Sequence, residues 1–444
     1  MSQASAAAPP PPAPAAAAAK PTKGKSKGAS KGGSAAQSGQ PATNTGPAEL
    51  AAARGIPSAL VRLRLIAALA VLVFTGLTAA QLMLGVNAAK QSAADAQQVI
   101  RVQDLKADLL RADALATNAF LVGGLEPADR RAAYDSAIAD ATKEIAAAAQ
   151  AQSLDQAALA ELSGLVVRYA ADMEVARANN RQGLPVGAAY LRASSAELRD
   201  RGMGLVDALL TANSARADRS LADQHPIWVA IPGVIALAVL VWVNQWLSKR
   251  FRRRLNVGVS AAAIAVLALT IAAVTASAAQ SLENAGLVRG DYAELVSAAD
   301  ARSAANAAKS SESLRLIARG SGKAFEDQWA ANAATVAQNV ASDLSLRWQD
   351  YVTAHKEVVA LDDAGDWDGA VALATAQDKG TSPAFTEFDD KLGADVAALS
   401  ERVSTTLSAG AQTPIIVAIL TVLAGLAATW GAWSGVSRRL EEYS

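Results

Sequence analysis

The chain has 444 residues, a formal net charge of zero at pH 7, no cysteine and two histidines. These counts exclude disulfides, thiolate metal sites, cysteine nucleophiles and histidine-rich metal clusters. Aromatic residues make up only 5% of the chain, strand signals are almost missing, and the abundant alanine is the best helix former. We therefore expect an all-α protein without a metal or cofactor.

Residues 1–56 are of low complexity, with four consecutive prolines at Pro9–Pro12 followed by Ala, Gly, Ser and Lys. Such a segment cannot bury enough apolar surface to offset the entropy of ordering, so we predict disorder. Two roles stay open for this basic tail. It either contacts anionic lipid, or it serves as a docking or phosphorylation segment.

Four apolar stretches come next, at 65–84, 227–247, 257–279 and 414–433. Each is close to the ~20 residues that cross a hydrocarbon core about 30 Å thick. The short loop between the second and third stretches carries a basic cluster: Lys249, Arg250, Arg252, Arg253 and Arg254. Because loops rich in Lys and Arg stay in the cytoplasm, we expect both chain termini to be cytoplasmic as well.

This topology predicts a multi-pass protein of the cell membrane with two extracytoplasmic domains. In chain order, its parts are a tail (1–56), a span (65–84), an outer domain (87–225), a span (227–247), a basic loop (248–256), a span (257–279), an outer domain (280–413), a span (414–433) and a tail (434–444).

Each outer domain has the pattern of an antiparallel four-helix bundle. The first has an apolar seam at Val102, Leu105, Leu109, Ala112, Ala116 and Ala119, and a last helix with Leu191, Leu198, Leu205 and Ala212 at heptad spacing. The second ends on a seam at Leu392, Val396, Leu399, Val403 and Leu407. Tyr169, Gly183 and Gly187 recur as Tyr351, Gly365 and Gly369, which favours a tandem repeat of roughly 190 residues.

The first and third helix breaks of each bundle should meet at the end farthest from the membrane. These distal tips are candidate partner-binding sites, with Gly123, Gly124, Asn179, Asn180, Arg181, Gln182, Pro185, Gly320, Asp363, Asp366 and Trp367. Tryptophan is enriched in binding hot spots. The alternative for Trp367 is that its ring closes the end of the bundle.

No phosphate-binding glycine loop, nucleophile elbow or metal-ligand spacing occurs in the sequence. We therefore expect neither catalytic residues nor an enzyme, and no nucleic-acid partner. Polar residues in the spans are mostly small or hydroxyl-bearing, as in the stretch from Gly425 to Thr429, which is typical of tight helix packing. Sensor domains use the same layout, an outer helical bundle joined to spans, to move a span upon binding.

The residues Leu115–Gly124 and Asp366–Ala370 resemble the four-helix-bundle sensor domains of bacterial chemoreceptors. The whole layout, together with the run Ala178–Leu191, resembles the GlnX-type membrane signalling proteins of actinobacteria. This resemblance implies a relay for nitrogen and amino-acid sensing. An extracytoplasmic glutamine- or glutamate-binding-type lipoprotein is the outer partner, and a cytoplasmic Ser/Thr protein kinase responds inside.

Two other hypotheses remain. The protein can bind a small ligand itself, with Arg101, Arg111, Arg177 and Arg192 as candidates to grip a carboxylate, although these arginines can equally be solvated or paired. It can also be a structural membrane scaffold. A homodimer is compatible with all three hypotheses.

Overall fold

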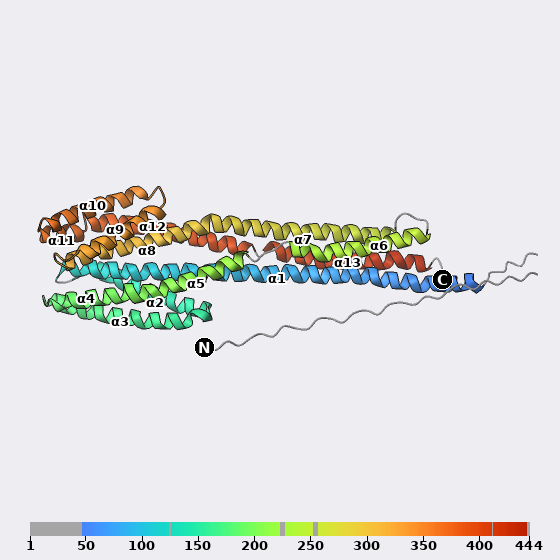
Figure 1. The fold of residues 1–444 in the computed structure, drawn as a ribbon, viewed down its shortest axis with the longest axis horizontal. Coiled ribbons are helices and arrows are strands. Elements are labelled where there is room, and N and C mark those ends of the chain that lie inside the picture. The colour runs from blue at the N-terminus through green and yellow to red at the C-terminus, as the bar shows by residue number, and fades with distance from the viewer. Residues whose placement is uncertain (1–46, 124–125, 223–226, 252–255, 411, 442–444) are drawn as a thin grey trace, which may run out of the picture. The chain divides into compact units, whose positions relative to one another are not determined.

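The structure is a computed structural model that describes residues 47–123, 126–222, 227–251, 256–410 and 412–441. Every regular element within these ranges is a helix, which confirms the expected all-helical class (Figure 1). The chain divides into two units, Met1–Arg54 and Gly55–Ser444. The packing described below is that of the second unit.

The helices of the first half are α1 (Pro47–Val122), α2 (Ala128–Ala151), the 3-10 turn η1 (Ser153–Asp155), α3 (Gln156–Arg181), α4 (Val186–Glu197), the π-helical turn η2 (Leu198–Gly202), α5 (Met203–Ala222) and α6 (Ile227–Phe251). Those of the second half are α7 (Val257–Arg289), α8 (Asp291–Ile317), α9 (Lys323–Asn339), α10 (Ser345–Asp363), α11 (Trp367–Thr375), α12 (Thr381–Ala409) and α13 (Gln412–Glu441). We call residues 87–222 the first helical group and residues 280–410 the second.

Among the described residues, four helices are long and apolar enough to cross a membrane, in the regions where the sequence predicts spans. They are compatible with a multi-pass membrane protein. Three of them run on into the helical groups, over Ala59–Val122, Val257–Ile317 and Thr381–Ser437. The helical groups are thus joined to these spans by helix.

Helix α1 begins at Pro47, inside the range 1–56 that the composition predicts to be disordered. Proline suits the first turn of a helix, and Ala51–Ala53 have the highest helix propensity. The prediction for residues 1–46 lies outside the described residues, as do Gly124 and Arg252–Arg254.

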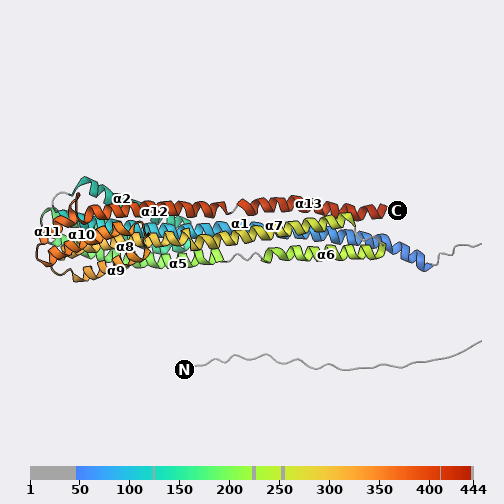
Figure 2. The ribbon, with the colours of Figure 1, turned by 90° about the horizontal axis from the view of Figure 1, so that it is seen from above.

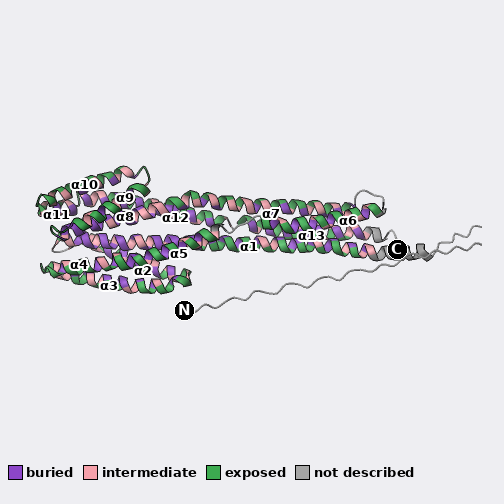
Figure 3. Cartoon of the chain, in the orientation of Figure 1, coloured by how far each residue is buried: buried purple, intermediate pink, exposed green. Residues whose placement is uncertain are grey.

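The spans share one apolar core. Figures 1 and 2 show α6, α7, α13 and the span part of α1 side by side. Buried residues from all four helices form the cluster, among them Phe74, Leu240, Val266 and Ala432. Exposed residues line the spans as well (Figure 3), which is the arrangement required of helices that also face lipid.

Two close approaches set which spans pack together. A Cβ atom added to Gly425 of α13 would lie 2.1 Å from the hydroxyl oxygen of Thr75 in α1, and one added to Gly233 of α6 would lie 2.1 Å from that of Thr270 in α7. The tight contact predicted from the small residues at Gly425 is therefore confirmed. Each span of the first half packs against a span of the second half.

The apolar seams predicted for α1 and α12 are confirmed, because all their residues are buried. The heptad predicted for the last helix of the first group is wrong beyond Leu198. The π-helical turn η2 inserts one residue per turn and shifts the register. Ala212 is consequently exposed, while Val206 and Ala217 are buried in its place.

The two helical groups share a single apolar core rather than two separate ones. The cluster contains Leu105 and Leu109 of α1 together with Ala301, Ala305 and Ala308 of α8. These small residues let the two helices approach closely. The two helical groups therefore pack against each other.

The Gly425–Thr75 contact predicts a position-specific effect. Gly425→Leu should lower the thermal unfolding midpoint of the protein in nanodiscs, because overpacking costs about 1–3 kcal/mol. Gly431 lies on the same helix with no heavy atom within 4 Å of an added Cβ, so Gly431→Leu is the matched control. Equal midpoints for the two variants would contradict the contact.

Candidate functional site at the junction of the helical groups

A buried carboxylate joins helices of both groups. Asp113 of α1 has no exposed surface. Its oxygens accept hydrogen bonds from Tyr169 of α3 at 3.2 Å, Ser195 of α4 at 2.8 Å and Ser310 of α8 at 2.5 Å. The Arg199 Nε atom lies 4.0 Å away. Four helices therefore meet at one negatively charged group.

Helices α1 and α8 meet through two contacts with the same separation along the chain. Ser310 lies 197 positions after Asp113, and Asp300 lies 197 positions after Gln103, whose amide donates to Asp300 at 3.2 Å. Two contacts with the same offset require the helices to run parallel and in register.

A second buried carboxylate, Asp389 of α12, lies at the same junction. Asn306 of α8 donates to it at 2.9 Å, and Arg302 of α8 lies 3.4 Å away. Arg111 of α1 reaches it across the junction at 3.6 Å. Asp389 therefore connects α12 to both α8 and α1.

Two carboxyl groups of α1 next to this junction have raised pKa values. Burial raises the pKa of Asp108 from 3.8 to about 7, against the opposing charge of Arg302. Burial, together with Glu144 of α2, raises the pKa of Asp104 to about 6. Both groups therefore titrate at pH values where ordinary carboxyl groups are fully ionised.

The second group contains a buried ionic network beside the junction. Lys309 donates to Glu312 at 2.6 Å and to Thr381 at 2.8 Å, and Glu312 faces His355 at 2.8 Å. Burial opposes ionisation of Glu312, but Lys309 and His355 outweigh it and bring its pKa to about 2. Burial lowers the pKa of His355. The partner carboxylates raise it by more, so that the net effect is a raised pKa. The His355 ring stacks on Trp329 at 3.7 Å between centroids.

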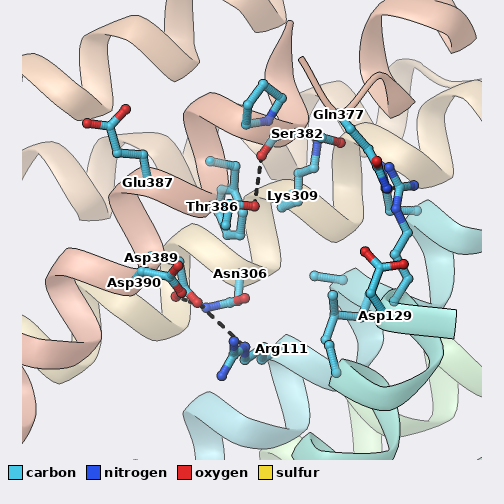
Figure 4. A pocket seen from close by; sticks show the side chains of 17 residues that line it. Arg111, Asp129, Asn306, Lys309, Gln377, Ser382, Thr386, Glu387, Asp389 and Asp390 are labelled. Carbon is cyan, nitrogen blue, oxygen red and sulfur yellow. Dashed lines mark hydrogen bonds and ion pairs between the residues drawn. The ribbon is translucent and has the colours of Figure 1, made fainter. Parts of the chain in front are cut away.

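A cavity of about 510 Å³ opens between these elements (Figure 4). Its walls come from α1, α2, α8 and α12, so both groups contribute. Asn306, Lys309 and Asp389 form its buried part, and Asp129 and Asp390 are exposed. A volume of this size suits a small organic ligand. No cluster of metal ligands occurs among the described residues.

The structure brings the predicted tip residues of the first group together. Asn180 donates to the Phe120 carbonyl at 2.8 Å, which joins the end of α3 to the end of α1. Arg181, Gln182 and Pro185 are exposed, whereas Gly123, Asn179 and Asn180 are half-buried. Gly123 adopts a positive φ of 65°. Their role in binding a partner stays a prediction.

The second tip is held by internal contacts. The Trp367 indole donates to the Leu316 carbonyl at 2.8 Å, and Arg319 lies over its ring at 3.9 Å. These contacts match the alternative in which Trp367 closes the helix ends. Asp363 pairs with Arg315 at 2.5 Å, Asp366 caps α11 at the Gly369 amide, and Gly320 is exposed.

The remaining predicted residues are distributed over the molecule. Of the four arginines proposed to grip a carboxylate, Arg111 lines the cavity. Arg101 contacts Gln98, Arg177 pairs with Glu126, and Arg192 bonds a carbonyl of its own helix. In the basic cluster, Lys249 is exposed at the end of α6, and the side chains of the other four lie outside the described residues.

Sequence reasoning missed Asp113, Asn306 and Asp389. The available signal was in α8, where Ser303–Leu316 alternates alanine and polar residues without an apolar face, and yet nearly every residue is buried. A helix without a separate apolar face is central to a structure when its polar groups find partners on several sides.

Comparison with known proteins concerns the first group. Residues 88–222 match the family model described as an actinobacterial sensor domain. No curated protein and no solved structure matches the chain. The match supports an actinobacterial sensor protein and a role in signalling.

The raised pKa of Asp108 predicts a pH-dependent stability. A carboxyl that binds its proton more tightly when folded contributes stability at low pH, and this contribution is lost as the pH rises through about 7. Asp108→Asn cannot ionise. Its unfolding midpoint should therefore exceed that of the wild type at pH 8, by about 2–4 °C per kcal/mol recovered, and match it at pH 3, where the carboxyl is protonated in the unfolded chain as well.

The control for this prediction is Asp327→Asn, because Asp327 is exposed and pairs only with Lys323 among the described residues. A difference between Asp108→Asn and wild type that is the same at both pH values would contradict the raised pKa.

Proposed function

We propose that the protein is a non-enzymatic transmembrane sensor, in which a change in the packing of α1 against α8 outside the membrane moves the spans. The observation that carries this proposal is the parallel contact between these helices through Gln103–Asp300 and Asp113–Ser310. Helix α1 continues into its span, and α8 follows the span helix α7 after Gly290. The sensor-domain match over residues 88–222 supports the same role.

The architecture that fits this proposal is a tandem repeat of two extracytoplasmic four-helix bundles in the cell membrane, with both termini cytoplasmic. Corresponding residues behave alike in support of it. Tyr169 and Tyr351 are both buried, and Gly183 and Gly365 both adopt positive φ angles. The basic loop at Lys249 supports the orientation, and it can also contact anionic lipid.

The contacts of α1 with other helices favour transmission of a movement from the helical groups to the spans. In the first group α1 contacts α5, where Lys106 pairs with Asp207 at 2.9 Å. At the end of its predicted span, the same helix contacts α13, where Arg64 donates to Ser437 at 3.1 Å and lies over the Trp433 ring. A shift of α1 outside therefore changes contacts between the halves inside. Packed helices have discrete arrangements, so such shifts act as switches.

Bridging α1 to α8 tests the transmission. Gln103→His with Asp300→His places two imidazoles at a natural contact, which Zn²⁺ can bridge. Nitroxide labels on Arg62→Cys and Lys249→Cys report the distance between the inner ends of α1 and α6 by pulsed electron–electron resonance. Because the chain has no cysteine, the labels are specific. Zn²⁺ should shift this distance by about 1–2 Å.

The control places the histidine pair within one helix. Arg131→His with Asp135→His, an i,i+4 pair on α2, binds Zn²⁺ without connecting the groups and should leave the inner distance unchanged. An unchanged distance upon bridging α1 to α8, or the same shift with the control pair, would contradict transmission through this contact.

For the signal that the sensor receives, we propose a relay. An extracytoplasmic amino-acid-binding lipoprotein is read at the first tip, and a cytoplasmic Ser/Thr kinase receives the signal. The resemblance to GlnX-type proteins supports the identity of both partners. At the tip, Leu184, Val186 and Tyr190 are each more than 40% exposed, next to the exposed Arg181. Apolar and aromatic residues grouped with arginine are typical of protein interfaces.

In-cell crosslinking tests the relay. A photoreactive residue at Arg181 should capture an amino-acid-binding lipoprotein, with a yield that changes with external amino acids. Arg219 is exposed at the other end of the first group and provides the matched control, which should not capture it. Capture of only other copies of this chain at Arg181, or equal capture at both positions, would contradict docking at the tip.

The alternative input is direct binding of a small ligand. The cavity favours it, because its walls come from both helical groups. A ligand there would contact α1 and α8 together, and its binding would bias the same contact that the relay acts on.

A further inference from the structure

The His355 ring lies between two carboxylates inside the second helical group. It belongs to α10, and its side chain is only 1% exposed. Its Nδ1 atom lies 2.8 Å from Oε2 of Glu312 on α8, and its Nε2 atom lies 3.4 Å from Oε1 of Glu326 on α9. A carboxylate oxygen accepts hydrogen bonds, and a neutral imidazole has a single N–H group. Both contacts are therefore hydrogen bonds only when the ring carries two protons.

The other groups packed against this ring bring no charge to it. On α9, the Trp329 indole stacks on the ring at 3.7 Å between centroids. On the same helix as the ring, Tyr351 lies 6.3 Å away, and burial raises the pKa of its phenol well above the ordinary value, so that it stays neutral. On α12, the Thr381 hydroxyl donates to Glu312. Glu312 and Glu326 are thus the charged groups that act on the ring.

The contact with Glu312 stays the same around neutral pH. Burial raises the pKa of Glu312, but Lys309 and His355 outweigh this effect and bring it to about 2. Glu312 is therefore ionised and accepts a hydrogen bond throughout the neutral range. A neutral His355 keeps its hydrogen on Nδ1, because the hydrogen bond that one ring nitrogen makes fixes the tautomer. The proton that His355 can lose is thus the one on Nε2.

Loss of this proton changes the second contact from attraction to repulsion. The Nε2 lone pair then faces the Glu326 carboxylate, and two acceptors cannot share a hydrogen bond. Glu326 keeps its contact with Arg315 of α8 at 3.4 Å, but it loses its bond to α10. The Glu326 side chain is 28% exposed. Water therefore reaches this side of the ring, where the proton can exchange.

The two carboxylates move the titration above that of an ordinary histidine. Burial lowers the pKa of His355, whereas its contacts with Glu312 and Glu326 raise it, with a net shift to above 6.5. A group whose pKa is raised in the folded state contributes stability below the unfolded pKa, and this contribution is lost as the pH rises through the folded pKa. The sensitive range therefore lies on the alkaline side of pH 6.5.

We propose that the contact between His355 Nε2 and Glu326 is a proton-dependent latch, which holds the first turns of α9 against α10 and releases them when the ring loses a proton. The latch is connected to the junction of the helical groups. Glu312 also binds Lys309, and the next residue of α8, Ser310, donates to Asp113. The inference goes beyond the proposed relay and does not rest on it, because it makes pH a signal that the second group receives.

Solid-state nitrogen NMR of the full chain in lipid bilayers tests the protonation. The chain has two histidines, so His225→Gln leaves His355 as the only labelled one. The ring should be mostly doubly protonated at pH 7, where an ordinary histidine with a pKa of about 6.5 is mostly neutral. Glu326→Gln should shift the titration to lower pH. A neutral ring at pH 7, or a titration that Glu326→Gln leaves unchanged, would overturn the proposal.

A double-mutant cycle tests whether the latch holds the helices. Unfolding midpoints in nanodiscs are compared for wild type, His355→Gln, Glu326→Gln and the double variant at pH 6 and pH 9. At pH 6 the double variant should be less destabilised than the sum of the single variants. This coupling should disappear or change sign at pH 9. The titration of Asp104 and Asp108 cancels, because all four proteins carry both residues.

Lys323 and Asp327 provide the matched control pair. They form an exposed ion pair on α9 at 3.0 Å, and neither residue type titrates between pH 6 and pH 9. The coupling measured with Lys323→Gln and Asp327→Asn should therefore be the same at both pH values.

Equal coupling of His355 and Glu326 at both pH values, or none at pH 6, would contradict the latch. Glu326→Gln guards against a folding defect at the buried ring, because Glu326 is partly exposed. This variant alone should lower the midpoint by more at pH 6 than at pH 9. The zinc-bridging experiment concerns α1 and α8, so a latch without transmission and transmission without a latch are distinguishable outcomes.

Discussion

The Asp113 carboxylate is the constraint on which the packing of the two helical groups depends. A fully buried charge is costly unless donors surround it, and its donors come from Tyr169, Ser195 and Ser310 on three other helices. Any movement of α8 relative to α1 breaks at least one of these bonds. The two helical groups are therefore held in register by polar contacts at the centre, within an apolar core of mostly small residues.

This central contact is coupled to the membrane by the course of α1. The helix runs without a break from its span to the junction, whereas α7 and α8 are separated at Gly290. Within the membrane, α1 and α13 approach at Thr75 and Gly425, and α6 and α7 approach at Gly233 and Thr270. The two halves of the chain thus contact each other both in the helical groups and in the spans. A ligand or partner that changes the junction has a continuous helical connection, through α1, to the far ends of the spans.

Much of this fold could be predicted from the sequence. Apolar periodicity located the spans and the seams of α1 and α12, since burial follows directly from spacing in an unbroken helix. The register beyond Leu198 could not be predicted, because no residue type marks the π-helical turn. Asp113, Asn306 and Asp389 were missed for another reason. Their partners lie 56, 83 and 197 positions away along the chain, and no local pattern reveals them. The cavity likewise exists only where both groups meet.

The most direct test of the account is a crosslink across α1 and α8 in native membranes. Gln103→Cys with Asp300→Cys should join with a short thiol-specific crosslinker, because these side chains touch. Gln103→Cys with Ser313→Cys should not, since a parallel α8 places position 313 about 20 Å farther along the axis. Efficient joining of the first pair alone is the predicted result. Joining of the second pair, or of neither, would contradict the parallel, in-register contact from which the proposed transmission follows.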